Sequence, residues 1–231
     1  MSEPNVNAIP MARQKGNVKQ MVSLAMICAI AFVVMLLSKM LPQVYTFLQL
    51  DVKDTVICIG GFVFGPVAAA AVSIIVPLLE MFFASDTGPI GFIMNVLATA
   101  SFCCTASFVY KKVHTKKGAI VGLTLGVVML TAVMLLWNYL ITPIYMGVPR
   151  ATVAAMLVPV FLPFNLGKYI LNAALTMLIY KPIVTALRKA RLVPESQAST
   201  QSRKLGAGYL LFSLALLATF VTIALVLMGI L

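Results

Sequence analysis

The sequence predicts an all-α integral membrane protein, and three features of its composition indicate that class. Of the 231 residues, 61% are hydrophobic, the mean hydropathy is +1.04, and only 10% are charged. Soluble domains are nearer to one quarter charged. A membrane-spanning helix needs about 20 mostly apolar residues, so the chain has room for roughly six or seven spans with short loops between them. Little of the chain is left for a soluble domain.

Apolar segments follow one another in order along the chain. A basic tail over residues 1–20 precedes a first span at about 22–41, and a partly apolar loop follows over 42–54. The stretch TVICIGGFVFGP at 55–66 is too short to span a bilayer and ends in Gly-Pro, a pair typical of turns. Further spans are expected at about 67–84, 90–110, 118–140, 157–180 and 205–231, with loops at 85–90 and 141–157.

Basic residues are concentrated in alternate loops. The tail at 1–20, the loop at 111–117 and the segment at 181–204 together hold thirteen of the 17 Lys and Arg residues. Because cytoplasmic loops carry an excess of such residues, we expect the N-terminus and these segments in the cytoplasm and the other loops outside. Since the charges are spread over loops, the net charge of +11 does not indicate nucleic-acid binding.

Three polar residues interrupt the apolar segment 157–180, namely Asn165, Lys168 and Asn172. At about 100° per residue they fall within roughly 60° of one another on one helix face. A lysine at this depth costs about 2.5 kcal/mol or more unless it meets water or a partner. One interpretation is the polar wall of a cavity that opens outward. The alternative is that Lys168 pairs with Glu80 or a helix carbonyl and only holds the bundle together.

Other polar and aromatic residues are expected at a similar outer depth. Asparagine amides there would suit a flat conjugated ligand, since one amide both donates and accepts against an imide edge, and aromatic walls would surround it. The alternatives are helix–helix hydrogen bonds and an interfacial aromatic belt. The residues at this level are Asn95, Asn138, Tyr45, Phe47, Trp137, Tyr139, Tyr145, Phe161 and Phe164.

Small residues recur at every fourth position in three places, one of which is the pair Gly61 and Gly65. Gly118, Gly122 and Gly126 form a face that favours close helix packing inside the protein. Ala25 and Ala29 form a similar face on the first span, which fits either internal packing or contact with another membrane protein.

Catalytic and nucleotide-binding motifs are absent from the sequence. It contains no G-x-x-x-x-G-K-[ST] motif and no HExxH motif, and its single histidine, His114, lies among lysines. The four cysteines lack CxxC or Cys/His spacing and are interpreted as small apolar side chains. We therefore expect neither an enzyme nor a metal site.

Several stretches resemble a known family of membrane proteins. FLQLDVKDTVICIGGFVFGPVAAA and the later TGPIGFIMN resemble the substrate-binding S components of energy-coupling factor (ECF) vitamin transporters. NYLITPIY and PFNLGKYILNAALTMLIYK look like the riboflavin-type member. The similarity covers about residues 20–192. It implies a six-helix S-component bundle over 21–192, between the cytoplasmic tail 1–20 and a linker at 193–204 that leads to one additional C-terminal transmembrane helix at 205–231.

The resemblance also implies a function and a set of contacts. The protein would bind riboflavin as transported ligand, without a cofactor, in the plasma membrane. A separate module of one transmembrane scaffold subunit and two cytosolic ATPases would supply the energy, and Ala25 with Ala29 would contact the scaffold. The residues implied at the vitamin site are Asn138, Asn165 and Lys168, with Asn95 as a fourth candidate and Phe47 and Leu48 in the covering outer loop.

Two departures from the riboflavin type leave alternatives open. Phe92 stands where such proteins often carry a glutamate, which allows FMN or another water-soluble vitamin as cargo. The helix at 205–231 lies outside the resemblance. A third hypothesis, of a different class, is a ligand-free membrane scaffold or assembly protein.

Overall fold

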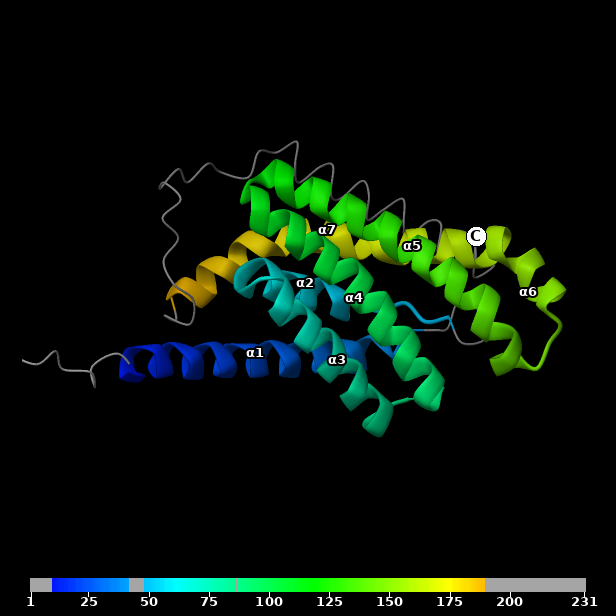
Figure 1. Cartoon of the computed structure of the whole chain (residues 1–231), viewed down its shortest axis with the longest axis horizontal. Coiled ribbons are helices and arrows are strands. Elements are labelled where there is room, and N and C mark those ends of the chain that lie inside the picture. Colours follow the sequence, from blue (N-terminus) through cyan, green and yellow to red (C-terminus); the bar gives the residue numbers. More distant parts are fainter. Residues whose placement is uncertain (1–9, 42–47, 86, 190–231) are drawn as a thin grey trace, which may run out of the picture.

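The computed structural model describes residues 10–41, 48–85 and 87–189, and these residues form an all-α bundle (Figure 1). The additional helix predicted at 205–231 lies outside the described residues. Among the described residues, five helical segments are long and apolar enough to cross a membrane. The helices are α1 (Pro10–Ser38), α2 (Lys53–Phe64), α3 (Pro66–Phe83), α4 (Gly88–Val113), α5 (Lys116–Met146), α6 (Arg150–Met156), the π-helix η1 (Leu157–Phe161) and α7 (Leu162–Lys189).

Two helix boundaries differ from those expected. Helix α1 begins at Pro10, inside the segment predicted as a tail, and most of the predicted loop at 141–157 is helical. Helix α5 continues until Gly147, whose positive φ of 64° ends the helix in the left-handed conformation that glycine adopts readily. Only residues 147–149 connect α5 to α6, so this connection is much shorter than predicted.

Helix α2 is a short inner helix, in agreement with the prediction that its segment cannot span the membrane. Nine of its residues are buried, and it contacts α1, α3, α4 and α7. Gly65, with a φ of 94°, turns the chain directly into α3, where Pro66 occupies the first turn. Because α2 starts in the interior, the charged residues at its N-terminus enter the bundle instead of facing a loop.

Close packing of α4 against α5 relies on the predicted glycine face. A Cβ atom on Gly122 would lie 2.7 Å from the carbonyl oxygen of Ala106, and one on Gly126 would lie 2.9 Å from that of Phe102. Both distances are shorter than van der Waals contact, so only glycine allows the two backbones to approach this closely. The packing interpretation is confirmed for these two glycines.

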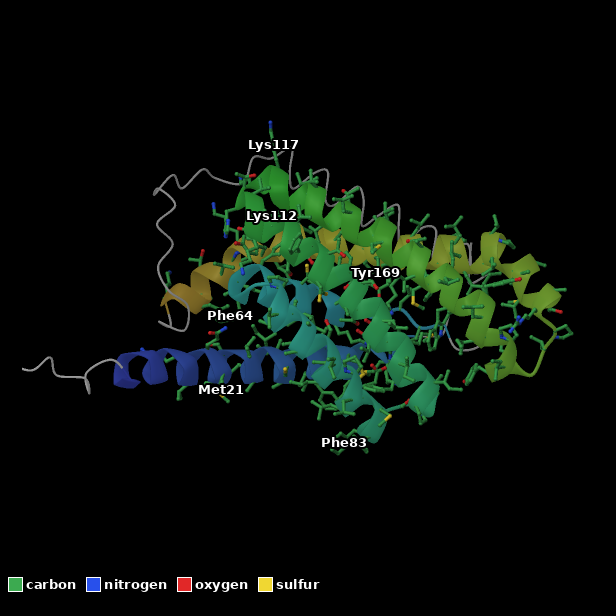
Figure 2. All side chains as sticks on the ribbon, viewed as in Figure 1. Met21, Phe64, Phe83, Lys112, Lys117 and Tyr169 are labelled. Carbon is green, nitrogen blue, oxygen red and sulfur yellow. The ribbon has the colours of Figure 1, made fainter. Side chains whose placement is uncertain are left out.

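The two ends of the bundle differ in character. Figure 2 shows Lys112 and Lys117 beside the turn between α4 and α5. The connections from α3 to α4 and from α5 to α6 lie at the opposite end (Figure 1). Between the ends, an apolar core that includes Ile57, Phe102 and Leu130 fills the bundle. Polar side chains gather beside this core, toward the end opposite to Lys112 and Lys117.

Candidate functional site

A cavity of about 340 Å³ is lined by residues of α3, α4, α5 and α7 and by residues of the connections that precede α2 and α4. Its volume falls within the range of about 300–1,000 Å³ that small-molecule sites occupy. The structure brings five of the predicted site residues to this cavity, while Phe47 lies outside the described residues. Those that line it are Leu48, Asn95, Asn138, Asn165 and Lys168.

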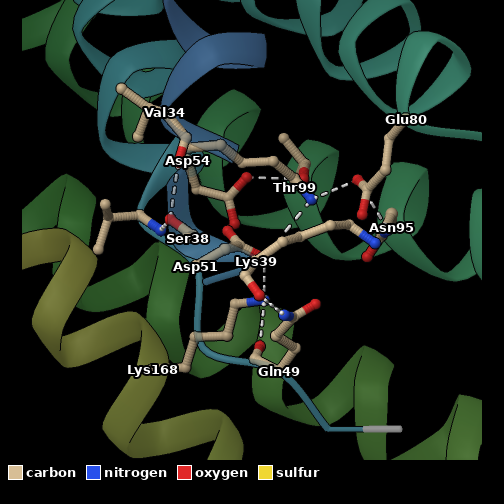
Figure 3. Close-up of polar contacts among 12 residues, drawn as sticks. Val34, Ser38, Lys39, Gln49, Asp51, Asp54, Glu80, Asn95, Thr99 and Lys168 are labelled. Carbon is tan, nitrogen blue, oxygen red and sulfur yellow. Dashed lines mark hydrogen bonds and ion pairs between the residues drawn. The ribbon is translucent and has the colours of Figure 1, made fainter. Parts of the chain in front are cut away.

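Lys168 is held by an ion pair with a partner that the sequence did not indicate. Its Nζ donates to Asp51 Oδ2 at 2.7 Å, and its side chain is only 10% exposed. The alternative that paired Lys168 with Glu80 is wrong, because the Glu80 carboxylate pairs with Lys53 at 2.8 Å and accepts a hydrogen bond from Asn95 (Figure 3). Asp51 reaches Lys168 because it lies in the segment that enters the bundle just before α2.

The charge of Asp51 follows from its two cationic neighbours. Burial alone would raise the pKa of its carboxyl group, but the ammonium groups of Lys168 and Lys53 outweigh that effect and lower the pKa to about 2. The Asp51 carboxylate is therefore ionised. Lys168 thus presents an ammonium group to the cavity while its charge remains balanced.

The two buried amides of the cavity are oriented by their own helices. Asn138 Nδ2 donates to the Met134 carbonyl at 2.7 Å, and Asn165 Nδ2 donates to the Phe161 carbonyl at 2.8 Å. The π-helix η1 ends at Phe161, and such distortions often occur at functional sites. Within the described part of the chain, no donor meets Asn165 Oδ1. This oxygen can therefore accept a hydrogen bond from a ligand.

Aromatic residues predicted near the cavity divide into two groups. Tyr145 and Phe164 line it, together with Tyr169, which the sequence analysis did not select. Tyr139 is exposed, as expected for the interfacial belt, and Phe161 is fully buried in a cluster with Leu48. Helical spacing did not indicate that Tyr169 lines the cavity. Its position follows from its packing against Phe102 on α4, with ring centroids 5.1 Å apart.

Asn172 does not belong to the cavity wall, although it shares a helix face with Asn165 and Lys168. It is fully buried, and its Oδ1 accepts hydrogen bonds from the backbone N–H and the hydroxyl of Thr55, at 3.0 and 2.9 Å. Its Nδ2 donates to the Asp51 carbonyl at 3.0 Å. Asn172 therefore gives the Thr55 N–H at the start of α2 a second acceptor, beside the Val52 carbonyl at 3.2 Å, and fixes Asp51 in place.

The structure also bears on Phe92, which stands where riboflavin-type proteins often carry a glutamate. Phe92 is not among the residues that line the cavity, whereas Glu80, from α3, lines it beside Asn95. A carboxylate is thus present at the site, supplied by a different helix.

We predict that Asn172→Leu destabilises the protein. The substitution leaves the buried Asp51 carbonyl without its donor, at about 1–3 kcal/mol, and leaves the Thr55 N–H only its bond to the Val52 carbonyl at 3.2 Å. Thermal unfolding in detergent should show a clearly lower midpoint. Thr176→Val, one turn further along α7, removes only a hydroxyl that bonds within the helix and should have a smaller effect. Equal shifts in the two variants would contradict this role of Asn172.

Comparisons with known proteins agree with this geometry. The family model described as "ECF transporter, substrate-specific component" matches residues 19–180. The chain is 32% identical to the Riboflavin transporter RibU of Staphylococcus aureus (strain TCH60), over 77% of this chain and 98% of that protein. It is also 32% identical to the Riboflavin transporter FmnP of Bacillus subtilis (strain 168), over 76% of this chain and 98% of that protein.

A solved structure supports the same assignment. The S component of a bacterial ECF transporter superposes with a TM-score of 0.64 at 30% identity, and the match covers 74% of this chain and 99% of that one. Proteins of this kind are membrane transport components that associate with an ECF module, and they are not enzymes. The chain belongs to the family of substrate-specific components of ECF transporters.

Proposed function

We propose that this chain binds riboflavin at the outer side of the plasma membrane and serves as the S component for its uptake. The observation that carries the proposal is the convergence of Asn138, Asn165 and Lys168 on one cavity of ligand size. The names of the relatives, which are riboflavin transporters, support the same ligand.

The cavity suits the chemistry of riboflavin. The isoalloxazine ring system is flat and carries an imide edge with two carbonyl acceptors and one N–H donor. Lys168 and the asparagine amides offer the matching donors and acceptors, while Tyr145 and Phe164 provide apolar walls. Hydroxyl groups of the ribityl chain would meet polar side chains at the rim, where Ser85 and Thr87 lie.

The orientation follows from the distribution of charge. Lys112 and Lys117 lie at the end of the bundle opposite to the loops beside the cavity (Figure 2). Since basic loops stay in the cytoplasm, the N-terminus would be cytoplasmic and the cavity would face outward. A ligand could then enter from the external medium.

We predict that the purified protein binds riboflavin and that Lys168→Ala weakens the binding about ten- to a hundredfold. A hydrogen bond to a charged group contributes about 1.5–3 kcal/mol, which corresponds to this range. Titration with riboflavin, followed by quenching of its fluorescence, measures the affinity. Lys181→Ala, an exposed lysine on the same helix, serves as the control and should bind as the unchanged protein does.

The outcome also separates the alternative functions. A tight complex with FMN or another vitamin, and none with riboflavin, would keep the transport role and replace the cargo. If no vitamin raised the thermal unfolding temperature, the ligand-free scaffold hypothesis would stand instead. Unchanged riboflavin affinity in Lys168→Ala would remove Lys168 from the site.

A second part of the proposal concerns the partners. Ala25 and Ala29 are exposed on α1, among exposed apolar residues such as Met26 and Ile30. Small exposed residues allow a partner helix to approach closely. We therefore place the contact with the transmembrane scaffold subunit on this face. Two cytosolic ATPases bound to the scaffold would supply the energy.

We predict that Ala25→Leu combined with Ala29→Leu abolishes uptake without affecting riboflavin binding, because the larger side chains block the approach of the scaffold. Uptake into proteoliposomes that contain the complete transporter measures the first effect, and fluorescence titration the second. Ala132→Leu, at an exposed alanine on α5, is the matched control. Full uptake by the double variant would place the scaffold contact on another face.

A further inference from the structure

Two carboxyl oxygens in the described part of the chain are buried without a hydrogen-bond partner. They are Oδ1 of Asp51 and Oδ2 of Asp54. Asp54 is fully buried at the start of α2, and Asp51 is nearly so. A buried acceptor without a donor costs about 1–3 kcal/mol, and more when it is charged. Two such atoms close together in sequence call for a shared physical explanation.

The two carboxyl groups are neighbours in space. Asp51 and Asp54 interact electrostatically, and Figure 3 shows their carboxyl groups turned toward each other. The remaining oxygen of each group has a partner. Asp51 Oδ2 accepts from Lys168 and faces Lys53, and Asp54 Oδ1 accepts from the Thr99 hydroxyl at 2.7 Å. The unpartnered oxygens are therefore Asp51 Oδ1 and Asp54 Oδ2, one on each of the two neighbouring groups.

The charges of the cluster are unequal when every group is ionised. Three carboxylates, those of Asp51, Asp54 and Glu80, meet two buried or nearly buried ammonium groups, those of Lys53 and Lys168. Lys39 also lines the cavity, but it is more exposed than these two ammonium groups and donates to the Ala84 carbonyl. One additional proton would make the inner cluster neutral, whereas without it a buried negative charge stays uncompensated.

We propose that Asp51 and Asp54 form a proton-binding site, in which a proton on Asp54 Oδ2 is donated to Asp51 Oδ1. Two carboxyl groups buried as neighbours cannot easily both ionise, and one of them commonly retains a proton. This inference goes beyond the proposed transport function and does not require riboflavin to be the ligand.

The surroundings assign the proton to Asp54. Asp51 has two ammonium neighbours, which favour its ionised form. The Thr99 hydroxyl of α4 donates to the Asp54 carboxyl, the Cys103 thiol of α4 donates to the Asp54 backbone carbonyl, and the Tyr169 hydroxyl of α7 lies beside the carboxyl as a further neutral donor. None of these three carries a positive charge at neutral pH. The more distant charges are those of Lys53, Glu80, Lys168 and Lys39, described above.

A proton on Asp54 would remove one negative charge from the residues behind the cavity wall. With Asp54 neutral, Asp51 can pair fully with Lys168 instead of being repelled by a second carboxylate. The ammonium group then stands at the cavity without excess negative charge behind it. Such a wall suits a ligand that carries no net charge.

The test is infrared spectroscopy of the purified protein at neutral pH, with aspartate labelled by ¹³C at its side-chain carboxyl. The sequence contains only three aspartates, Asp51, Asp54 and Asp86, so the label isolates very few groups. We expect a C=O stretching band of a protonated carboxyl that shifts with the label. Asp86→Asn should keep the band, and Asp54→Asn should lose it.

Several outcomes would overturn the proposal. The absence of a label-sensitive band would mean that both carboxylates are ionised, as they would be around a water molecule or a sodium ion. A band that disappears in Asp86→Asn would place the proton elsewhere. If Asp54→Asn failed to fold, the labelled spectra of the unchanged protein and of Asp86→Asn would still decide whether the pair holds a proton.

Discussion

The constraint on which the site depends is the burial of an ammonium group in an apolar helix bundle. An unpaired charge in such a setting costs several kcal/mol, and breaking a buried pair typically costs about 3–5 kcal/mol. Lys168 avoids this cost through Asp51, which lies outside its own helix. Because Asp51 belongs to the segment between α1 and α2, the pair also fixes that segment against α7. The ion pair thus both positions the ammonium group and holds this wall of the cavity together.

The ion pair is one part of a polar layer that crosses the bundle. From Asp51 the contacts continue to Lys53, then to Glu80 on α3 and Asn95 on α4. Asn172 ties the start of α2 to α7 from below. Under this layer lies a core of closely packed apolar residues, in which glycines let α4 approach α5. The lower layer provides packing, and the upper layer provides the charged and amide groups that a ligand can meet.

Composition and spacing in the sequence predicted the class of protein, the order of the helices and the cavity-facing positions of Asn165 and Lys168. They could not supply the partner of Lys168. Glu80 or a helix carbonyl was one alternative for that partner, but the inner helix α2 brings Asp51 to Lys168, and Glu80 pairs with Lys53 instead. Asn172 was assigned to the cavity for a similar reason. Helical spacing gives the direction in which the Asn172 side chain points. Only the packing of α2 against α7 shows that Thr55 lies in that direction and bonds to it.

The ion pair between Asp51 and Lys168 is tested most directly by a double-mutant cycle on thermal stability. The cycle compares Asp51→Asn, Lys168→Met and the double variant with the unchanged protein in the same detergent. We expect each single variant to lose more stability than an exposed substitution would, and the double variant to lose about 0.5–3 kcal/mol less than the sum of the two. Strictly additive losses would show that the two side chains are not coupled, and would contradict this account of the site.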